Sequence, residues 1–132
     1  RELLGWIHGD LWLGNVVVDE AGAPRGLIDW GGMQFAGLPA VDLMHLVLTT
    51  RALAAGAELG PTVADALEFP RWSEAEDRLL ATCETGGPGI GRSGLVLLAW
   101  LHHITSLAPR WRGATGRWLW VARNVDSVLG IR

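Results

Sequence analysis

The sequence predicts an α+β fold that is mostly α-helical, with one small β-hairpin near its beginning. Two short apolar runs at residues 16–18 and 26–28 flank a turn-forming segment at 19–25, as in a hairpin. From residue 39 onward the apolar residues recur with helical spacing. Because 132 residues with 49% hydrophobic content can bury one core, we expect a single domain over residues 1–132.

Four segments of the later chain carry helix signals. Pro39 suits a first helical turn and Gly56 is a plausible stop. Ser73 and Glu76 have the spacing of a capping box, in which the two side chains satisfy backbone donors at a helix start. Two further apolar segments lie towards the end of the sequence. We expect helices over residues 39–55, 73–84, 95–107 and 116–129.

The residues that point to chemistry are His8-Gly9-Asp10, Asn15 and Ile28-Asp29-Trp30. This spacing is typical of a metal-nucleotide phosphoryl-transfer site. In such a site one Asp accepts the proton of an acceptor hydroxyl, while an Asn and a second Asp hold Mg²⁺. Oxygen-bearing side chains of these types suit a hard cation.

The predicted hairpin explains how distant residues could share one cation. Asn15 leads into its first strand and Asp29 leaves its second strand, although fourteen positions separate them. A hairpin brings its two open ends together. We therefore expect Asn15 and Asp29 to lie near one metal ion, with Asp10 presented by the tight loop before them.

The stretch "HGDLWLGNVVVDEAGAPRGLIDWGGMQFAGLPAVDL" resembles the catalytic and metal-binding segments of the aminoglycoside phosphotransferase and choline kinase-like family, relatives of the protein kinases. The resemblance implies the C-terminal lobe of a protein-kinase-like fold, with the small hairpin carrying the metal site. It makes Asp10 the catalytic residue and Asn15 and Asp29 the metal ligands.

Three further residues have supporting roles in this interpretation. The resemblance makes His8 a structural member of the catalytic loop. It matches Asp42 to the acid that opens the following helix and braces that loop by hydrogen bonds. Trp30 is expected to wall the metal site.

The function that the resemblance implies is ATP-dependent O-phosphotransfer from the γ-phosphate of ATP, with Mg²⁺, to a hydroxyl of a small metabolite or antibiotic. Kinase-like folds also need a Gly-rich loop and a strand-borne Lys to hold the nucleotide. The chain has no Lys, and seven residues precede His8. We therefore expect the nucleotide-binding lobe to lie outside this chain, in the same or an upstream polypeptide.

Two other functions remain open. The chain could be a truncated, non-catalytic remnant that acts as a binding or structural module. It could instead be a metal-dependent hydrolase with the same oxygen ligands, but such sites usually recruit His ligands or additional carboxylates, which the sequence does not place near Asp29.

Composition narrows the possible partners and location. A formal net charge of −3 and a pI near 5.7 argue against a nucleic-acid partner. The longest apolar run, residues 95–101, is too short to span a bilayer, so we expect no membrane partner. One cysteine, Cys83, and no visible signal peptide are consistent with the cytoplasm.

Two other features have simpler interpretations. Residues 89–96 fit the letters of a Gly-rich phosphate loop, but both flanking runs look helical, so we interpret them as a turn between helices. His102 and His103 are adjacent on a predicted helix, where their side chains point about 100° apart and cannot readily share one metal. We expect packing or polar contacts from both.

Overall fold

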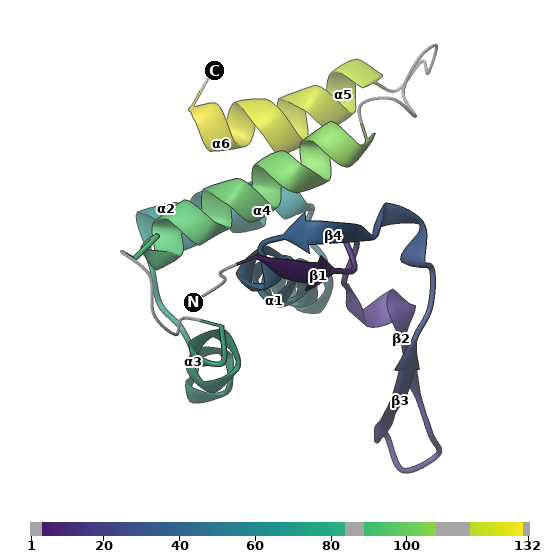
Figure 1. Ribbon diagram of the computed structural model, residues 1–132. Helices are drawn as coiled ribbons and strands as arrows, with labels where there is room; N and C mark the ends of the chain where they lie inside the picture. Colours follow the sequence, from purple (N-terminus) through teal and green to yellow (C-terminus); the bar gives the residue numbers. More distant parts are fainter. Residues whose placement is uncertain (1–3, 84–88, 108–116, 131–132) are drawn as a thin grey trace.

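Figure 1 shows the computed structural model of the chain, which describes residues 4–83, 89–107 and 117–130. It is mostly helical with two small antiparallel sheets, as the α+β prediction requires. The strands and short helices of the first third are β1 (Gly5–Ile7), η1 (Leu13–Asn15), β2 (Val16–Val18), β3 (Pro24–Leu27), η2 (Trp30–Gly32) and β4 (Gln34–Gly37). The helical body consists of α1 (Pro39–Ala55), α2 (Leu59–Glu68), α3 (Glu74–Ala81), α4 (Arg92–Leu107), α5 (Arg117–Val121), η4 (Ala122–Asp126, a π-helical turn) and α6 (Ser127–Leu129).

The predicted hairpin is formed by β2 and β3, which project away from the helical body (Figure 1). Val16 pairs with Leu27, and the second strand begins at Pro24, two residues earlier than expected. The turn is held by Asp19, whose Oδ1 accepts hydrogen bonds from the backbone N–H groups of Ala21 and Ala23. An Asp that bonds its own turn in this way favours a tight reversal of the chain.

A second small sheet, formed by β1 and β4, was not predicted. The two strands are antiparallel, with Gly5 opposite Gly37. Strands of three and four residues carry almost no periodic signal, and their partners are about thirty residues apart in sequence. This sheet covers α1 and supports the start of the loop at residues 8–12, which leaves β1 at Ile7 (Figure 1).

Helix α1 has the bounds that the sequence predicts. Pro39 occupies the first turn, and Gly56 ends the helix in the left-handed conformation, with φ of 61°. Glycine adopts this conformation without the steric cost of a Cβ atom, which is why it commonly terminates helices. Both boundaries are therefore set by local backbone chemistry.

Helix α2 was missed because its sequence begins with residues that usually break helices. Gly60 and Pro61 lie in its first turn, where a backbone N–H has no partner within the helix and proline is tolerated. Gly60 has a second purpose. A Cβ atom there would collide with the backbone of Arg123 and Asn124, so its absence allows η4 to approach α2 closely.

The remaining helices differ from their predicted bounds in three ways. Ser73 and Glu76 form the predicted capping box, but α3 ends at Ala81. Helix α4 begins at Arg92, three residues earlier than expected. The predicted turn at 89–96 is therefore wrong for residues 92–96, which are helical, whereas residues 89–91 precede the helix. The last helix is interrupted by the π-helical turn η4, which periodicity does not reveal.

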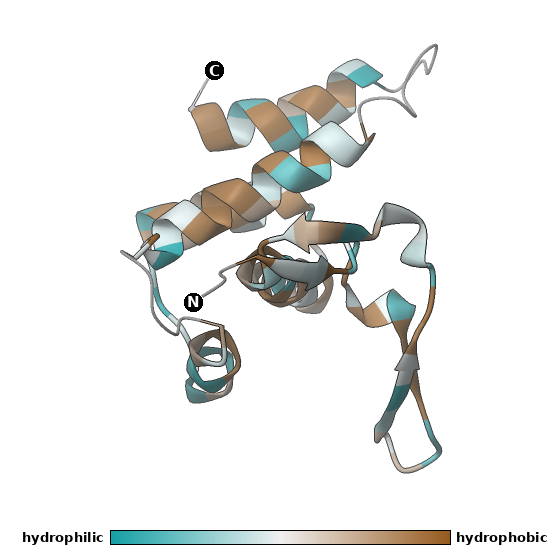
Figure 2. Ribbon diagram, in the orientation of Figure 1, coloured by the Kyte–Doolittle hydropathy of each residue, from teal (hydrophilic) through white to brown (hydrophobic). Residues whose placement is uncertain are grey.

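The core lies where α1, α2 and α4 meet, with α6 packed on α2. Met44 and Leu48 of α1, Val63 of α2 and Val96 of α4 are completely buried. Figure 2 shows apolar and polar bands alternating along α4 and the last helix, as expected for helices that pack on one side. Among the described residues, no helix is both long and apolar enough to cross a membrane.

Candidate active site

The loop that follows β1 carries His8, Gly9 and Asp10 and lies against the helical body. Gly9 has φ of 79°, and a Cβ atom on it would collide with the backbone of Gly32. A residue with a side chain would therefore meet both backbone strain and a steric clash at this point. The turn places Asp10 at the surface of the loop, where it is half-buried.

His8 is buried, and both of its ring nitrogens are used by backbone groups. Its Nε2 lies 2.8 Å from the carbonyl oxygen of Ile28, and its Nδ1 lies 3.3 Å from the backbone nitrogen of Asp10. A carbonyl only accepts, so Nε2 carries the hydrogen and Nδ1 accepts from Asp10 N–H. His8 thus links the loop to the end of the hairpin and has no nitrogen left for proton transfer.

Asp42, in the first turn of α1, accepts two hydrogen bonds from the same loop. Its carboxylate oxygens receive the backbone N–H groups of His8 at 2.5 Å and Gly9 at 3.0 Å, and the side chain is buried. Hydrogen bonds to an ionised acceptor are stronger than those between neutral groups. Asp42 therefore fixes the two residues that precede Asp10.

Two histidines also hold the loop, through its carbonyl oxygens. His45 of α1 donates from Nδ1 to Leu11 O at 2.9 Å, and His102 of α4 donates from Nε2 to Gly9 O at 2.8 Å. The loop is thus attached to both helices. The expected polar role of His102 is confirmed by this contact.

Asn15 and Ile28 are joined at the open end of the hairpin. The Ile28 N–H donates to Asn15 O at 3.0 Å, so Asp29 is the next residue after this link. The Asn15 side chain is buried, and its Nδ2 donates to Asp10 O at 2.9 Å. One hydrogen-bond network therefore connects the backbone of Asp10, the carboxamide of Asn15 and the residue before Asp29.

Asp29 has the one left-handed backbone conformation among the described residues other than glycine, with φ of 60° and ψ of 58°. Its side chain is exposed. Asp tolerates this conformation better than most residues, but the conformation still has an energetic cost. Backbone strain of this kind is concentrated at functional sites.

Trp30 follows Asp29 and lies over His8. Their ring centroids are 4.7 Å apart, and the indole Nε1 donates to Leu27 O at 3.0 Å. The indole is 45% exposed, so one of its faces covers His8 while another remains open to solvent. Trp30 thereby shields the hydrogen bonds of His8.

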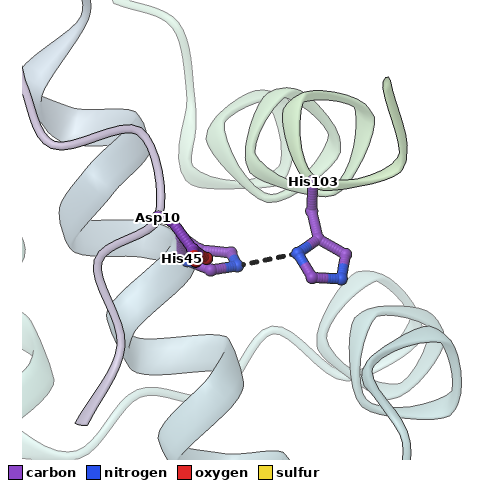
Figure 3. A group of neighbouring side chains, drawn as sticks. All are labelled: Asp10, His45 and His103. Carbon is purple, nitrogen blue, oxygen red and sulfur yellow. Dashed lines mark hydrogen bonds between the residues drawn. The ribbon is translucent and has the colours of Figure 1, made fainter. Parts of the chain in front are cut away.

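A cluster that the sequence did not reveal surrounds Asp10 on its other side. One ligand atom from each of Asp10, His45 and His103 lies within 4.8 Å of the other two. Figure 3 shows His45 on α1 and His103 on α4 facing each other, with Asp10 in front of His45. His45 Nε2 and His103 Nδ1 are 3.1 Å apart. The expected polar contact of His103 is confirmed, but its partner was not foreseen.

Burial disfavours the charged form of both imidazoles in this cluster. Burial lowers the pKa of His45, against the opposing effects of its bond to Leu11 O and the charge of Asp10. Burial and the neighbouring His45 ring lower the pKa of His103 to about 4. Since His45 Nδ1 carries the hydrogen donated to Leu11 O, its Nε2 accepts from His103 Nδ1–H.

Only part of this cluster had a signal in the sequence. His45 follows Asp42 by three positions, so both lie on one polar stripe of a helix that is otherwise apolar. His103 is 58 residues further along the chain, and no local pattern connects it with His45. Only the packing of α1 against α4 brings it to Asp10.

The loop, the hairpin and the bracing helix define a protein of the kinase-like phosphotransferase class. A model of the phosphotransferase enzyme family matches residues 2–80, more than half of the chain, and the chain belongs to this family, which includes the aminoglycoside phosphotransferases and choline kinase-like enzymes. The match contains the loop, the hairpin and α1, whereas His102 and His103 lie beyond it. No curated protein and no solved structure matches the chain.

Proposed function

We propose that this chain is the C-terminal, catalytic lobe of an ATP-dependent O-phosphotransferase that acts on a hydroxyl of a small metabolite or antibiotic. Membership of the phosphotransferase enzyme family supports the reaction class. The observation that carries the assignment of residues is the network that joins Asp10, Asn15 and the end of the hairpin.

In this proposal Asp10 is the catalytic residue. Its carboxylate orients the acceptor hydroxyl and takes its proton as the hydroxyl oxygen bonds to the γ-phosphorus. The bond between that phosphorus and the bridging oxygen of ATP breaks, and ADP leaves with the electron pair. The bonds from Asp42, His45 and His102 support this role because they hold the loop backbone on both sides of Asp10.

The donors at the hairpin fit Mg²⁺. The Asn15 Nδ2 is occupied by Asp10 O, which leaves the amide Oδ1 as the donor oxygen. Among the described residues, none donates a hydrogen bond or forms an ion pair with the Asp29 carboxylate, which is exposed. Asn15 and Asp29 would hold the cation, with Trp30 as a wall beside it. When bound, Mg²⁺ offsets negative charge on the phosphoryl group.

We further propose that a nucleotide-binding lobe, in the same or an upstream polypeptide, completes the site. The chain has no Lys to contact nucleotide phosphates. Apolar side chains are also exposed around the strands, including Trp6 and Phe35, which are 67% and 65% exposed and contact each other edge to face. A covering lobe would remove such a patch from water. Because the donor is ATP, we place the reaction in the cytoplasm.

Titration with Mg-ATP of a polypeptide that joins this chain to its nucleotide-binding lobe tests the proposal. Metal-dependent nucleotide binding, and phosphate transfer to an alcohol acceptor, are the expected results. The exposed apolar patch also suits the alternative of a non-catalytic remnant, which would neither bind the nucleotide nor transfer phosphate. Nucleotide binding that is unchanged when Mg²⁺ is chelated would contradict the metal site.

Two substitutions of Asp29 separate a metal ligand from a structural residue. Asp29→Gly relieves the left-handed backbone, so the protein should keep or gain stability. Both Asp29→Gly and Asp29→Asn should nevertheless bind Mg²⁺ more weakly than the unsubstituted chain. We expect phosphotransfer to fall by at least about 100-fold in both, because a metal contributes several kcal/mol of transition-state stabilisation. Asp65→Asn, at an exposed carboxylate of α2, is the matched control. Undiminished transfer in the Asp29 variants would remove the assignment.

A further inference from the structure

The cluster of Asp10, His45 and His103 has a composition that differs from the oxygen donors at the hairpin. It offers two imidazole nitrogens and one carboxylate oxygen, all within 4.8 Å of one another. Imidazole suits zinc, copper, iron and nickel, whereas Mg²⁺ prefers oxygen ligands. The two sides of the catalytic loop therefore present donors for two chemically different kinds of cation.

The two imidazole nitrogens are already spaced for a small ion, and a carboxylate oxygen of Asp10 lies within 4.8 Å of both. Zn²⁺ binds imidazole nitrogen at about 2.0–2.1 Å with tetrahedral angles, which places two such nitrogens roughly 3.3 Å apart. His45 Nε2 and His103 Nδ1 are 3.1 Å apart (Figure 3). An ion between them would replace one hydrogen bond and would require little movement of either helix.

The protonation of both rings also favours metal binding. A histidine that binds a metal must be in its neutral form. Burial lowers the pKa of both rings, so they stay neutral at pH values at which an exposed histidine is already protonated. The Asp10 charge partly balances a cation, while His102 and Asp42 are the other titratable groups near the pair. His103 would release its Nδ1 hydrogen to the other ring nitrogen or to water on binding.

His45 has, in addition, the outer contact that metal-bound histidines need. Its Nδ1–H donates to Leu11 O at 2.9 Å, which fixes the tautomer and directs the Nε2 lone pair into the cluster. Metal-ligating histidines almost always donate their second nitrogen in this way, and the bond orients the ring. In the cluster this contact exists without any ion.

We propose that Asp10, His45 and His103 form a binding site for a transition-metal ion of the zinc type, separate from the Mg²⁺ site. Three protein ligands leave a fourth position for water, as in zinc sites that are open to solvent. An ion held there occupies the carboxylate of Asp10. Zn²⁺ therefore inhibits phosphotransfer, a consequence that rests on the catalytic role proposed for Asp10.

Competition with a chromophoric chelator measures Zn²⁺ binding to the intact chain. We expect one Zn²⁺ per chain. Loss of an outer contact alone lowers metal affinity roughly 10–100-fold, so His103→Gln and Asp10→Asn, which each remove a ligand, should lower Zn²⁺ affinity by at least that much. Asp65→Asn is the matched control, because it makes the same substitution as Asp10→Asn at an exposed carboxylate of α2. It should bind Zn²⁺ as the unsubstituted chain does.

Co²⁺ gives a second measurement that does not depend on activity. Its visible absorption should be that of a tetrahedral nitrogen and oxygen site, and should be lost in His103→Gln while circular dichroism shows the fold retained. Absence of stoichiometric binding, or equal affinity in His103→Gln and Asp65→Asn, would overturn the proposal. Zinc binding without any phosphotransfer would leave this site standing and count against the proposed function. Magnesium-dependent phosphotransfer that Zn²⁺ does not inhibit would support the proposed function and count against the zinc site.

Discussion

The substitution Asp42→Asn isolates the bracing of the loop that follows β1, because it keeps the shape of the side chain and removes its charge. The carboxylate accepts from two buried backbone N–H groups, those of His8 and Gly9. A carboxamide has one accepting oxygen, and its NH₂ group would face the second N–H. One donor is then left without a partner in a buried position.

The magnitude follows from these two bonds. Hydrogen bonds to a charged group contribute about 1.5–3 kcal/mol, and an unsatisfied buried donor costs about 1–3 kcal/mol. Loss of a negative charge in the first turn of α1 adds about 0.3–1 kcal/mol. These terms overlap, so we expect the free energy of unfolding to fall by about 2–4 kcal/mol. With an m-value of about 2 kcal/mol per molar urea, the midpoint shifts by about 1–2 M.

Urea denaturation of Asp42→Asn, with Asp65→Asn as the exposed control, measures this difference. The control should stay within about 0.5 kcal/mol of the unsubstituted chain. Amide hydrogen exchange provides the local test, since the N–H groups of His8 and Gly9 should exchange faster in Asp42→Asn. A variant that unfolds at the same urea concentration, with both amides still protected, would refute the bracing.

Three further changes have expected outcomes. Glu76→Gln should lower the free energy of unfolding by about 1–2 kcal/mol at pH 7, because Arg51 lowers the pKa of Glu76 to about 2 and solvent partly screens this pair, whose side chains are 25% and 20% exposed. In urea titrations the difference should shrink as the pH falls from 4.5 towards 2, and a difference independent of pH would contradict the reasoning. Ser73→Ala should cost about 1 kcal/mol through loss of the helix cap, measured by thermal unfolding, and an unchanged Tm would contradict this contribution. Gly60→Ala should destabilise the chain by about 1–3 kcal/mol, since its Cβ would meet the backbone of Arg123, and a neutral result would show that η4 can move away.

Features set by local chemistry were predictable from the sequence. The bounds of α1 follow from Pro39 and Gly56, and the start of α3 follows from the capping box of Ser73 and Glu76. The hairpin follows from apolar runs that flank a turn held by Asp19. Each of these signals acts within a few residues, where backbone preferences decide the structure.

Features set by distant partners were not predictable. The β1–β4 sheet depends on pairing across most of the first third of the chain, and α2 begins with residues that usually indicate a turn. The candidate site divides in the same way. Asp10, Asn15 and Asp29 form a local motif, whereas His103 reaches Asp10 only because two helices pack together.

The π-helical turn at residues 122–126 makes the chain sensitive to length at this point. Each residue of a helix rotates the next by about 100°, so deleting one residue here would turn all later side chains to a different face. Val128 would lose its packing against the core, and the carbonyl of Asn124 would no longer meet the indole of Trp100. The exposed turn of the hairpin has no such constraint. Insertions and deletions among natural variants should therefore gather at residues 19–23 and avoid the C-terminal helix.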